Sequence, residues 1–291
     1  MLDGMKINNR LPAENEITSL ANYMAFVESA QREIRENNSD NLLIFRGQSV
    51  DEPLLPKMAR LHMVHRKWDI WQRHTLLETE SRMLFEFKRR ARPFLASVPE
   101  TDWEWLALAQ HHGMDTRLLD WTSNALVGLY FALEEERDQA QRVVWVLRAS
   151  PEDIVPPASD VNPFSLPATK FYRPSLLSPH IIAQDGWFSV HKYMKAQDSF
   201  VSLEHNRAFK TRLRKLRITG DRHIHLPQLD LCGVNRAALF PGLDGLCTHL
   251  NWKRGPDNWV HIRMPQALSD TKTPSNKELH RIPHLRRVRK R

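Results

Sequence analysis

The chain has 291 residues, of which 41% are hydrophobic and 26% charged, and its formal net charge is +8. These proportions are ordinary for a soluble globular protein. No apolar run approaches the roughly 18 residues that a membrane-spanning helix needs. The first residues, MLDGMKINNR, lack the charged-then-apolar pattern of a secretory leader. We therefore expect a cytoplasmic protein without a membrane contact.

Two cysteines, Cys232 and Cys247, are too few for a disulfide framework, which favours a reducing compartment. Cysteines without a disulfide usually pack as small hydrophobic residues, so we expect both to be buried. A chain of this length can bury a substantial core as one large domain.

The N-terminal part of the chain carries strong local patterns. Apolar residues at helical spacing predict an amphipathic helix over residues 18–37. The apolar run 41–45 predicts a buried strand that ends in Arg-Gly-Gln. Residues 51–70 are irregular, and residues 75–90 predict a second helix.

The middle of the chain predicts two further helices. The sequence TDWE at 101–104 has the pattern of a capping box, from which a helix runs to about His112. Gly113 follows where a helix end favours a left-handed residue. A helix over residues 124–137 is apolar on nearly every side at its start and therefore belongs to the core.

The second half has shorter elements. Residues 150–180 are rich in proline and predict a long loop that wraps the core. Around this loop we expect strands at 142–148, 180–182, 186–190 and 199–203, followed by short helices within 223–253.

This element order predicts a single mixed α+β domain with a central sheet flanked by helices. We expect an N-terminal extension at 1–17, the domain at 18–253 and a basic tail at 254–291. The tail offers a polyanion contact. The chain has no Gly-rich dinucleotide fingerprint and no P-loop.

Arg46 is the first candidate for chemistry, because it follows a buried strand. A buried guanidinium needs a partner, which is either a ligand phosphate or an acidic residue of the fold such as Glu80. Gly47 beside it allows a ligand or a backbone to approach closely.

The central segment supplies a second cluster of polar residues. Arg117 and Asp120 are expected to form an internal ion pair, and Thr122 or Ser123 is expected to cap the following helix. This structural interpretation leaves Gln110 and two histidines unexplained.

His111 and His112 do not have the spacing of a metal site. Neighbours on a helix point about 100° apart, whereas zinc ligands usually lie one turn apart. No cysteine is near in sequence, so we expect no metal. A serine hydrolase is not indicated either, because the turn G-x-S-x-G is missing.

Together these segments resemble the FRG domain family, which is named for a Phe/Tyr-Arg-Gly motif, here Phe45 to Gly47. The family's strongest block is close to QHxGxxTRLLDWTxxxxxALYFA. The chain matches this block from Gln110 to Ala132, with Gly128 where alanine is usual. A late block, LFPGLDGL at 239–246, has Gly242 where aspartate is usual.

The resemblance implies a role in conflict between bacteria and phages, as a toxin or an anti-phage defence effector. The pattern is also distantly similar to ADP-ribosyltransferases of the R-S-E type, which implies a sheet like theirs and NAD as substrate. Their strand-end arginine is matched by Arg46, and their Ser-Thr-Ser strand by Thr122 and Ser123. Their later glutamate has two candidate positions here, Gln184 and Glu204.

This similarity assigns roles to the candidate residues. Arg46 would hold the pyrophosphate, aromatic rings would stack on nicotinamide, and an acid or amide would stabilise the oxocarbenium-like state. The catalytic candidates are Arg46, His111, His112, Thr122, Ser123, Gln184 and Glu204. The candidates for holding NAD are Arg46, Gly47, Gln48, Gln110, Arg117, Asp120, Trp121 and Tyr130.

Three functions follow from these observations. The first is an NAD-consuming enzyme, either an ADP-ribosyltransferase with a protein or nucleic-acid acceptor or an NAD glycohydrolase. The second is a non-catalytic module that senses a nucleotide or a phage or host protein. The third is a nuclease or other hydrolase, for which the basic tail is the main indication.

Overall fold

The computed structural model describes residues 16–60, 74–137, 141–156, 161–174 and 178–254. The chain divides into two units at residue 249, and the described residues from 16 to 249 belong to the first. No helix within the described ranges combines the length and the apolar character that crossing a membrane requires.

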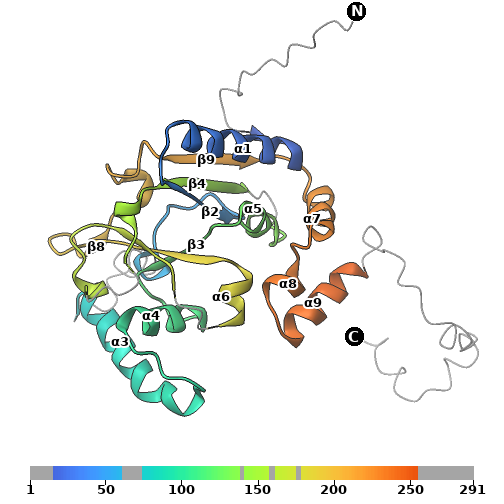
Figure 1. Cartoon of the computed structure of the whole chain (residues 1–291). Coiled ribbons are helices and arrows are strands. Elements are labelled where there is room, and N and C mark those ends of the chain that lie inside the picture. The colour runs from blue at the N-terminus through green and yellow to red at the C-terminus, as the bar shows by residue number, and fades with distance from the viewer. Residues whose placement is uncertain (1–15, 61–73, 138–140, 157–160, 175–177, 255–291) are drawn as a thin grey trace, which may run out of the picture. The chain divides into compact units, whose positions relative to one another are not determined.

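The first unit is α+β, as predicted (Figure 1). Its main sheet has the strand order β1-β9-β4-β2-β3-β6-β5 among the described residues, and a small hairpin pairs β7 with β8. The sheet is mixed, because β1 runs parallel to β9 while the other neighbours are antiparallel. The strands are β1 Glu16–Ile17, β2 Leu42–Gln48, β3 Leu118–Thr122, β4 Val143–Ala149, β5 Lys170–Tyr172, β6 Gly186–Val190, β7 Tyr193–Met194, β8 Ser199–Phe200 and β9 Leu213–Ile218.

The helices begin at side-chain caps that the sequence partly reveals. Ser19 caps α1, and Thr75 and Glu78 form a full capping box at α3. At α4 the Thr101 hydroxyl accepts from the Glu104 N–H, as predicted, but the Glu104 carboxylate accepts from the Glu100 N–H at 2.8 Å. The helices are α1 Leu20–Glu36, α3 Leu76–Ala91, α4 Asp102–His111, α5 Ala125–Leu133, α6 Pro179–Ala183, α7 Arg222–Leu231, α8 Arg236–Leu239 and α9 Leu243–Lys253.

Helix α5 packs directly on strand β2 (Figure 1). A Cβ atom added to Gly47 would lie 2.0 Å from the carbonyl oxygen of Gly128, and one added to Gly128 would lie 2.7 Å from the Cβ of Phe45. Two glycines thus let the helix and strand backbones touch. The close approach that Gly47 permits is therefore that of α5.

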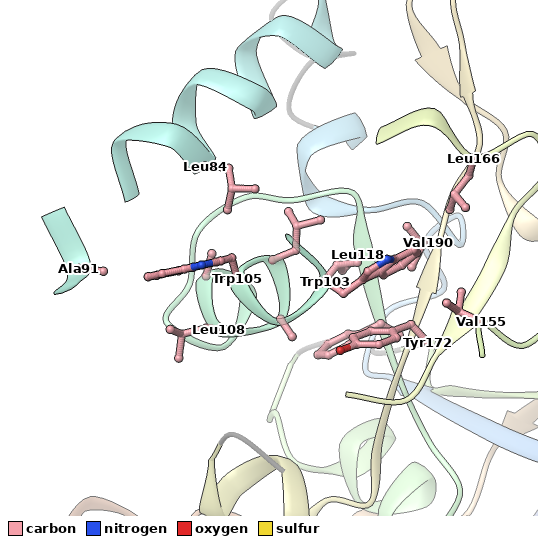
Figure 2. Close-up of a cluster of buried hydrophobic side chains, with 14 residues drawn as sticks. Leu84, Ala91, Trp103, Trp105, Leu108, Leu118, Val155, Leu166, Tyr172 and Val190 are labelled. Atoms are coloured by element: carbon pink, nitrogen blue, oxygen red, sulfur yellow. The ribbon is translucent and has the colours of Figure 1, made fainter. Parts of the chain in front are cut away.

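Helix α4 supplies most of a second core region. Its tryptophans Trp103 and Trp105 pack with Leu84 of α3, Leu118 of β3 and Tyr172 of β5 (Figure 2). The rings of Trp103 and Tyr172 have centroids 5.0 Å apart. This cluster fixes the C-terminal end of α4 relative to β3, and that end carries the paired histidines.

The start of α5 differs from the prediction. Asn124, rather than Thr122 or Ser123, caps the helix, since its Oδ1 accepts from the N–H groups of Leu126 and Val127. Asparagine is among the most favoured N-cap residues, because its side-chain oxygen accepts from the free amides of the first turn. The helix ends at Leu133 instead of about residue 137.

Two further predictions about elements are wrong, and so is one about the cysteines. Residues 180–182 lie in α6 instead of a strand, because Ser178 caps the helix and Pro179 occupies its first turn. The proline-rich segment 150–180 is not one loop, since it contains β5 and the start of α6. Cys232 and Cys247 are both exposed rather than buried.

Candidate functional site

The central sheet splits beside Arg46. Strand β4 pairs with every residue of β2, whereas β3 pairs with β2 only at Phe45 and Thr122. The Arg46 side chain crosses the gap, and its Nη1 donates to the backbone carbonyl of Asp120 at 2.7 Å. The guanidinium thus hydrogen-bonds to a backbone carbonyl of β3 at the point where β2 and β3 separate.

A cavity of about 720 Å³ lies at this split. Its size falls within the roughly 300–1,000 Å³ of small-molecule sites. Its walls bring together many of the predicted residues, namely Arg46, Gly47, Gln48, Gln110, His111, His112, Asp120, Trp121, Thr122 and Gln184. Segments far apart in the sequence therefore converge on one open site.

The buried position of the Arg46 guanidinium is electrostatically unfavourable. Its side chain is 14% exposed, and its Nε is buried with no hydrogen-bond partner among the described residues. Burial lowers the pKa of Arg46, as does Arg60, while Asp120 and Glu52 act in the opposite direction. Because burial disfavours the charged guanidinium, an anionic ligand beside Arg46 would stabilise it.

Hydrogen bonds from a neighbouring side chain hold the Asp120 carboxylate in place. The Gln110 side-chain nitrogen donates to both carboxylate oxygens, at 3.2 and 3.4 Å. The Thr116 hydroxyl donates to the Gln110 Oε1 at 2.7 Å, which fixes the orientation of the amide. Arg46 Nη1 lies 3.8 Å from the carboxylate, which is nevertheless 60% exposed.

Three histidines line the cavity next to Asp120. His180 Nδ1 and His111 Nε2 are 3.1 Å apart, and the rings of His111 and His112 have centroids 5.0 Å apart. Burial lowers the pKa of His111, and His112 and His180 add to the effect, while Asp120 opposes it. This lowered pKa favours the neutral imidazole of His111 near pH 7. Across the described part of the chain, no set of three or more His, Cys, Asp or Glu residues is arranged to hold a metal ion.

The other ionisable groups of the cavity come in pairs. Arg60 pairs with Glu52, and Arg137 pairs with Glu135 at 2.6 Å. The Ser49 hydroxyl also donates to Glu135. Since each lining arginine has a carboxylate partner, the cavity is unlike the uncompensated basic groove of a nucleic-acid-binding protein.

The predicted pairing of Arg117 with Asp120 is wrong, and so is the alternative pairing of Arg46 with Glu80. Arg117 and Glu80 form a fully buried ion pair instead, with Nη2 and Oε2 2.7 Å apart. Arg117 also donates to the Pro163 carbonyl. Neither charged group reaches water, so each needs the opposite charge of the other as its partner. Arg117 thus lies outside the cavity.

Several other candidates also have internal partners. The Thr122 hydroxyl donates to the Gln184 carbonyl at 2.7 Å, and the Trp121 indole N–H donates to Ser189 at 3.0 Å. Ser123 donates to Asp185, and Glu204 accepts from the Leu54 N–H at 3.2 Å. Ser123 and Glu204 do not line the cavity.

Tyr130 is buried in α5 and does not line the cavity. Burial raises its pKa to about 12, against the opposing effect of Arg236 and Arg222, so its hydroxyl stays protonated. Its neighbour Phe131 lines the cavity instead.

Sequence reasoning missed part of the cavity wall. His180 and Phe240 were not singled out because each lies on a short element far from the central block. Glu134 follows directly on the apolar helix, and Glu52 and Arg60 lie in the segment judged irregular. A signal for Phe240 did exist, since it belongs to the late block LFPGLDGL.

The fold and the cavity define a mixed α+β protein with an open polar cleft at a split in its sheet. Residues 41–141 match the family model of the FRG domain, the family that the sequence motifs resemble. The matched segment contains Arg46, Gln110 and Asp120, whereas Gln184 and Phe240 follow it. Neither a curated protein nor a solved structure matches the chain.

Proposed function

We propose that the cleft binds NAD and breaks its bond to nicotinamide, either by hydrolysis or by transfer of ADP-ribose to an acceptor. The observation that carries this proposal is the convergence of Arg46, Asp120 and Gln184 on one cavity of nucleotide size. Arg46 and a group from the second half of the chain are the two elements that such chemistry requires.

Arg46 is assigned to the pyrophosphate of NAD. Its guanidinium suits a charge-assisted contact with phosphate oxygens, and it already has a fixed position through the Asp120 carbonyl. Gln184 is held by its side-chain nitrogen, which donates to the Leu239 carbonyl at 3.1 Å. An amide in this place is assigned to a ribose hydroxyl.

Asp120 is assigned to the reacting carbon. Glu204 lies outside the cavity, so the proposal gives the carboxylate role to the exposed, Gln110-held Asp120. When the bond between C1′ and the nicotinamide nitrogen breaks, the electron pair leaves with nicotinamide and positive charge develops on the ribose. A preorganised carboxylate stabilises that charge.

His111 completes the hydrolytic reaction. Water attacks C1′ and forms ADP-ribose, and the neutral imidazole takes the released proton. The hydrogen bond to His180 orients the ring. In the transfer reaction, an acceptor nucleophile takes the place of water. A cytoplasmic effector role in conflict between bacteria and phages is part of the proposal and is supported by the family resemblance.

A second candidate is a non-catalytic nucleotide sensor. The pairing of Arg46, Arg60 and Arg137 with carboxylates favours it, because such pairs also serve a structural role. The nuclease alternative has no comparable support from the cavity. The basic residues 255–291, on which that alternative depends, lie outside the described residues.

The test is nicotinamide release. Purified protein is incubated with NAD, with and without bacterial lysate as a source of acceptors, and free nicotinamide is followed by chromatography. We expect turnover by the wild type and a loss of about 100-fold or more in Asp120→Asn.

Glu33→Gln is the matched control, because Glu33 is an exposed carboxylate that pairs with an arginine, Arg148, and does not line the cavity. It should retain full turnover. Circular dichroism checks the folding of each variant. The absence of nicotinamide release by the wild type under both conditions would exclude the enzymatic proposal and leave the sensor.

A further inference from the structure

Four half-buried aromatic rings line one part of the cavity. They are His111 of α4, His180 of α6, Phe240 after α8 and Phe131 of α5. Their ring centroids follow one another at 4.9 Å from His111 to His180, 6.1 Å from His180 to Phe240, and 6.2 Å from Phe240 to Phe131. We call these four residues the ring wall.

A cation–π contact and a close backbone packing contact hold Phe240 in the ring wall. The Arg236 guanidinium lies over its ring, 3.7 Å from the centroid, and also pairs with Glu134. A Cβ atom added to Gly245 would lie 1.9 Å from the Phe240 carbonyl oxygen, so a glycine is needed there for α9 to pack.

The carbonyl of the preceding residue is fixed as well, since it accepts from the Gln184 side chain. The block LFPGLDGL thereby acquires a physical role, which is to hold Phe240 at the cavity. A phenylalanine that lines an open cavity leaves apolar surface in water at about 25 cal/mol for each Å². Its fixed position is explained if a ligand covers that surface.

Most residues that line the remainder of the cavity are polar or charged. Arg46, Gln110 and Asp120 face the same space from β2, α4 and β3. A ligand that fits both parts has a flat aromatic ring joined to hydroxyl and phosphate groups. Aromatic faces bind every nucleobase by stacking, with little dependence on its edge.

We infer that the ring wall is the subsite for the planar base of a nucleotide. The rings of Phe131 and Phe240 meet at 82°, so a base that stacks on the face of one contacts the other edge-on. This inference rests on the proposed function, because both place a nucleotide in this cavity. It goes further by naming the groups that recognise the base. Adenine and nicotinamide share the required chemistry.

Calorimetric titration with three probes tests the inference. Adenosine monophosphate carries the adenine, nicotinamide mononucleotide carries the nicotinamide, and ribose 5-phosphate carries neither. We expect at least one of the two nucleotides to bind the wild type more tightly than ribose 5-phosphate, and which one binds identifies the base.

Phe240→Leu removes the ring and keeps an apolar side chain. It should weaken binding of that nucleotide about fivefold or more and leave ribose 5-phosphate binding unchanged. Phe131→Leu, at a second position in the ring wall, should also weaken binding of the nucleotide. It replaces Phe240→Leu in the test if that variant does not fold. Phe85→Leu is the control, because Phe85 is 66% exposed on α3 and does not line the cavity.

Three results would overturn the inference: no nucleotide binding by the wild type, equal binding of all three probes, or nucleotide binding that both ring variants retain in full. The outcome is separate from that of the proposed function. A protein that binds a nucleotide through Phe240 but releases no nicotinamide from NAD would keep this subsite and lose the enzymatic proposal.

Discussion

Arg117 and Glu80 form a pair of charges that are both removed from water. Their side chains are 1% and 0% exposed, and the pair joins α3 to the residue that precedes β3. The rings of Phe164 and Phe200 lie over the guanidinium at 4.6 and 5.5 Å. The pair therefore fixes the strand that carries Asp120 without reaching the cavity itself.

Removing one partner of this pair should be strongly destabilising. Glu80→Gln leaves the guanidinium buried without its counter-charge, and we expect the free energy of unfolding to fall by about 3–5 kcal/mol. Urea denaturation measures the change. Glu86→Gln, on the same helix, removes exposed pairs with Arg89 and Arg90 and should have a far smaller effect. Equal effects of the two variants would contradict this account.

His191 is a second buried group with a predictable effect, this time on the pH dependence of stability. Its Nδ1–H donates to the Val201 carbonyl at 3.0 Å, and its Nε2 accepts from the Ser189 hydroxyl, which in turn accepts from Trp121. Burial lowers the pKa of His191 to about 4, although the hydrogen bond to Val201 raises it. The folded protein thus keeps this imidazole neutral.

The unfolded chain takes up a proton at His191 near pH 6.5, whereas the folded chain does so only near pH 4. Stability should therefore fall as the pH is lowered through this window, by on the order of 3 kcal/mol from this residue. His191→Gln cannot titrate, so its unfolding free energy should fall less over the same window. Parallel curves for the two proteins would show that His191 does not contribute.

At the scale of the elements, β2 and α5 approach each other closely through their backbones beside the cavity. The oxygen of Gly128 occupies the space that a side chain at position 47 would need. The Phe-Arg-Gly motif thus has two physical functions. The glycine admits the helix, and the arginine bridges the split sheet.

Gly47→Ala should separate α5 from β2. A methyl group 2.0 Å from a backbone oxygen cannot be accommodated by a side-chain rotation, so we expect a loss at or above the upper end of about 1–3 kcal/mol. Thermal or urea unfolding measures it. Gly186→Ala is the control, because its nearest neighbour would lie at an ordinary 3.5 Å, and it should change stability by less than about 1 kcal/mol. A tolerated Gly47→Ala would disprove the packing argument.

The sequence predicted the bounds of an element well where one local pattern determines them. Helix α3 was predicted to within a residue at each end, because its capping box and apolar stripe lie within one stretch of sequence. The strand β9 was not predicted, since basic residues interrupt its apolar pattern. In the fold its apolar residues Leu213, Leu216 and Ile218 are buried in the sheet.

At the scale of the whole molecule, the sequence indicated which residue types belong to the site but not how they pair. Arg46, Asp120 and Gln184 were all candidates, and the fold brings them to one cavity. The partners of Arg46 and Arg117 were exchanged in the predictions, because pairing depends on tertiary distances that residue spacing does not contain. Phe240 was missed for the same reason.

The most direct test of the central claim is the binding of an NAD analogue in the cavity beside Arg46. A carbocyclic NAD analogue, whose bond to nicotinamide resists hydrolysis, is titrated calorimetrically into the wild type, Arg46→Ala and Arg148→Ala. Arg148 is the matched control, because it lies on β4, pairs with Glu33 and does not line the cavity. We predict one saturable site in the wild type and in Arg148→Ala. Folded Arg46→Ala should bind the analogue at least about tenfold more weakly than the wild type. No binding by the wild type, or equal binding by all three proteins, would contradict the account.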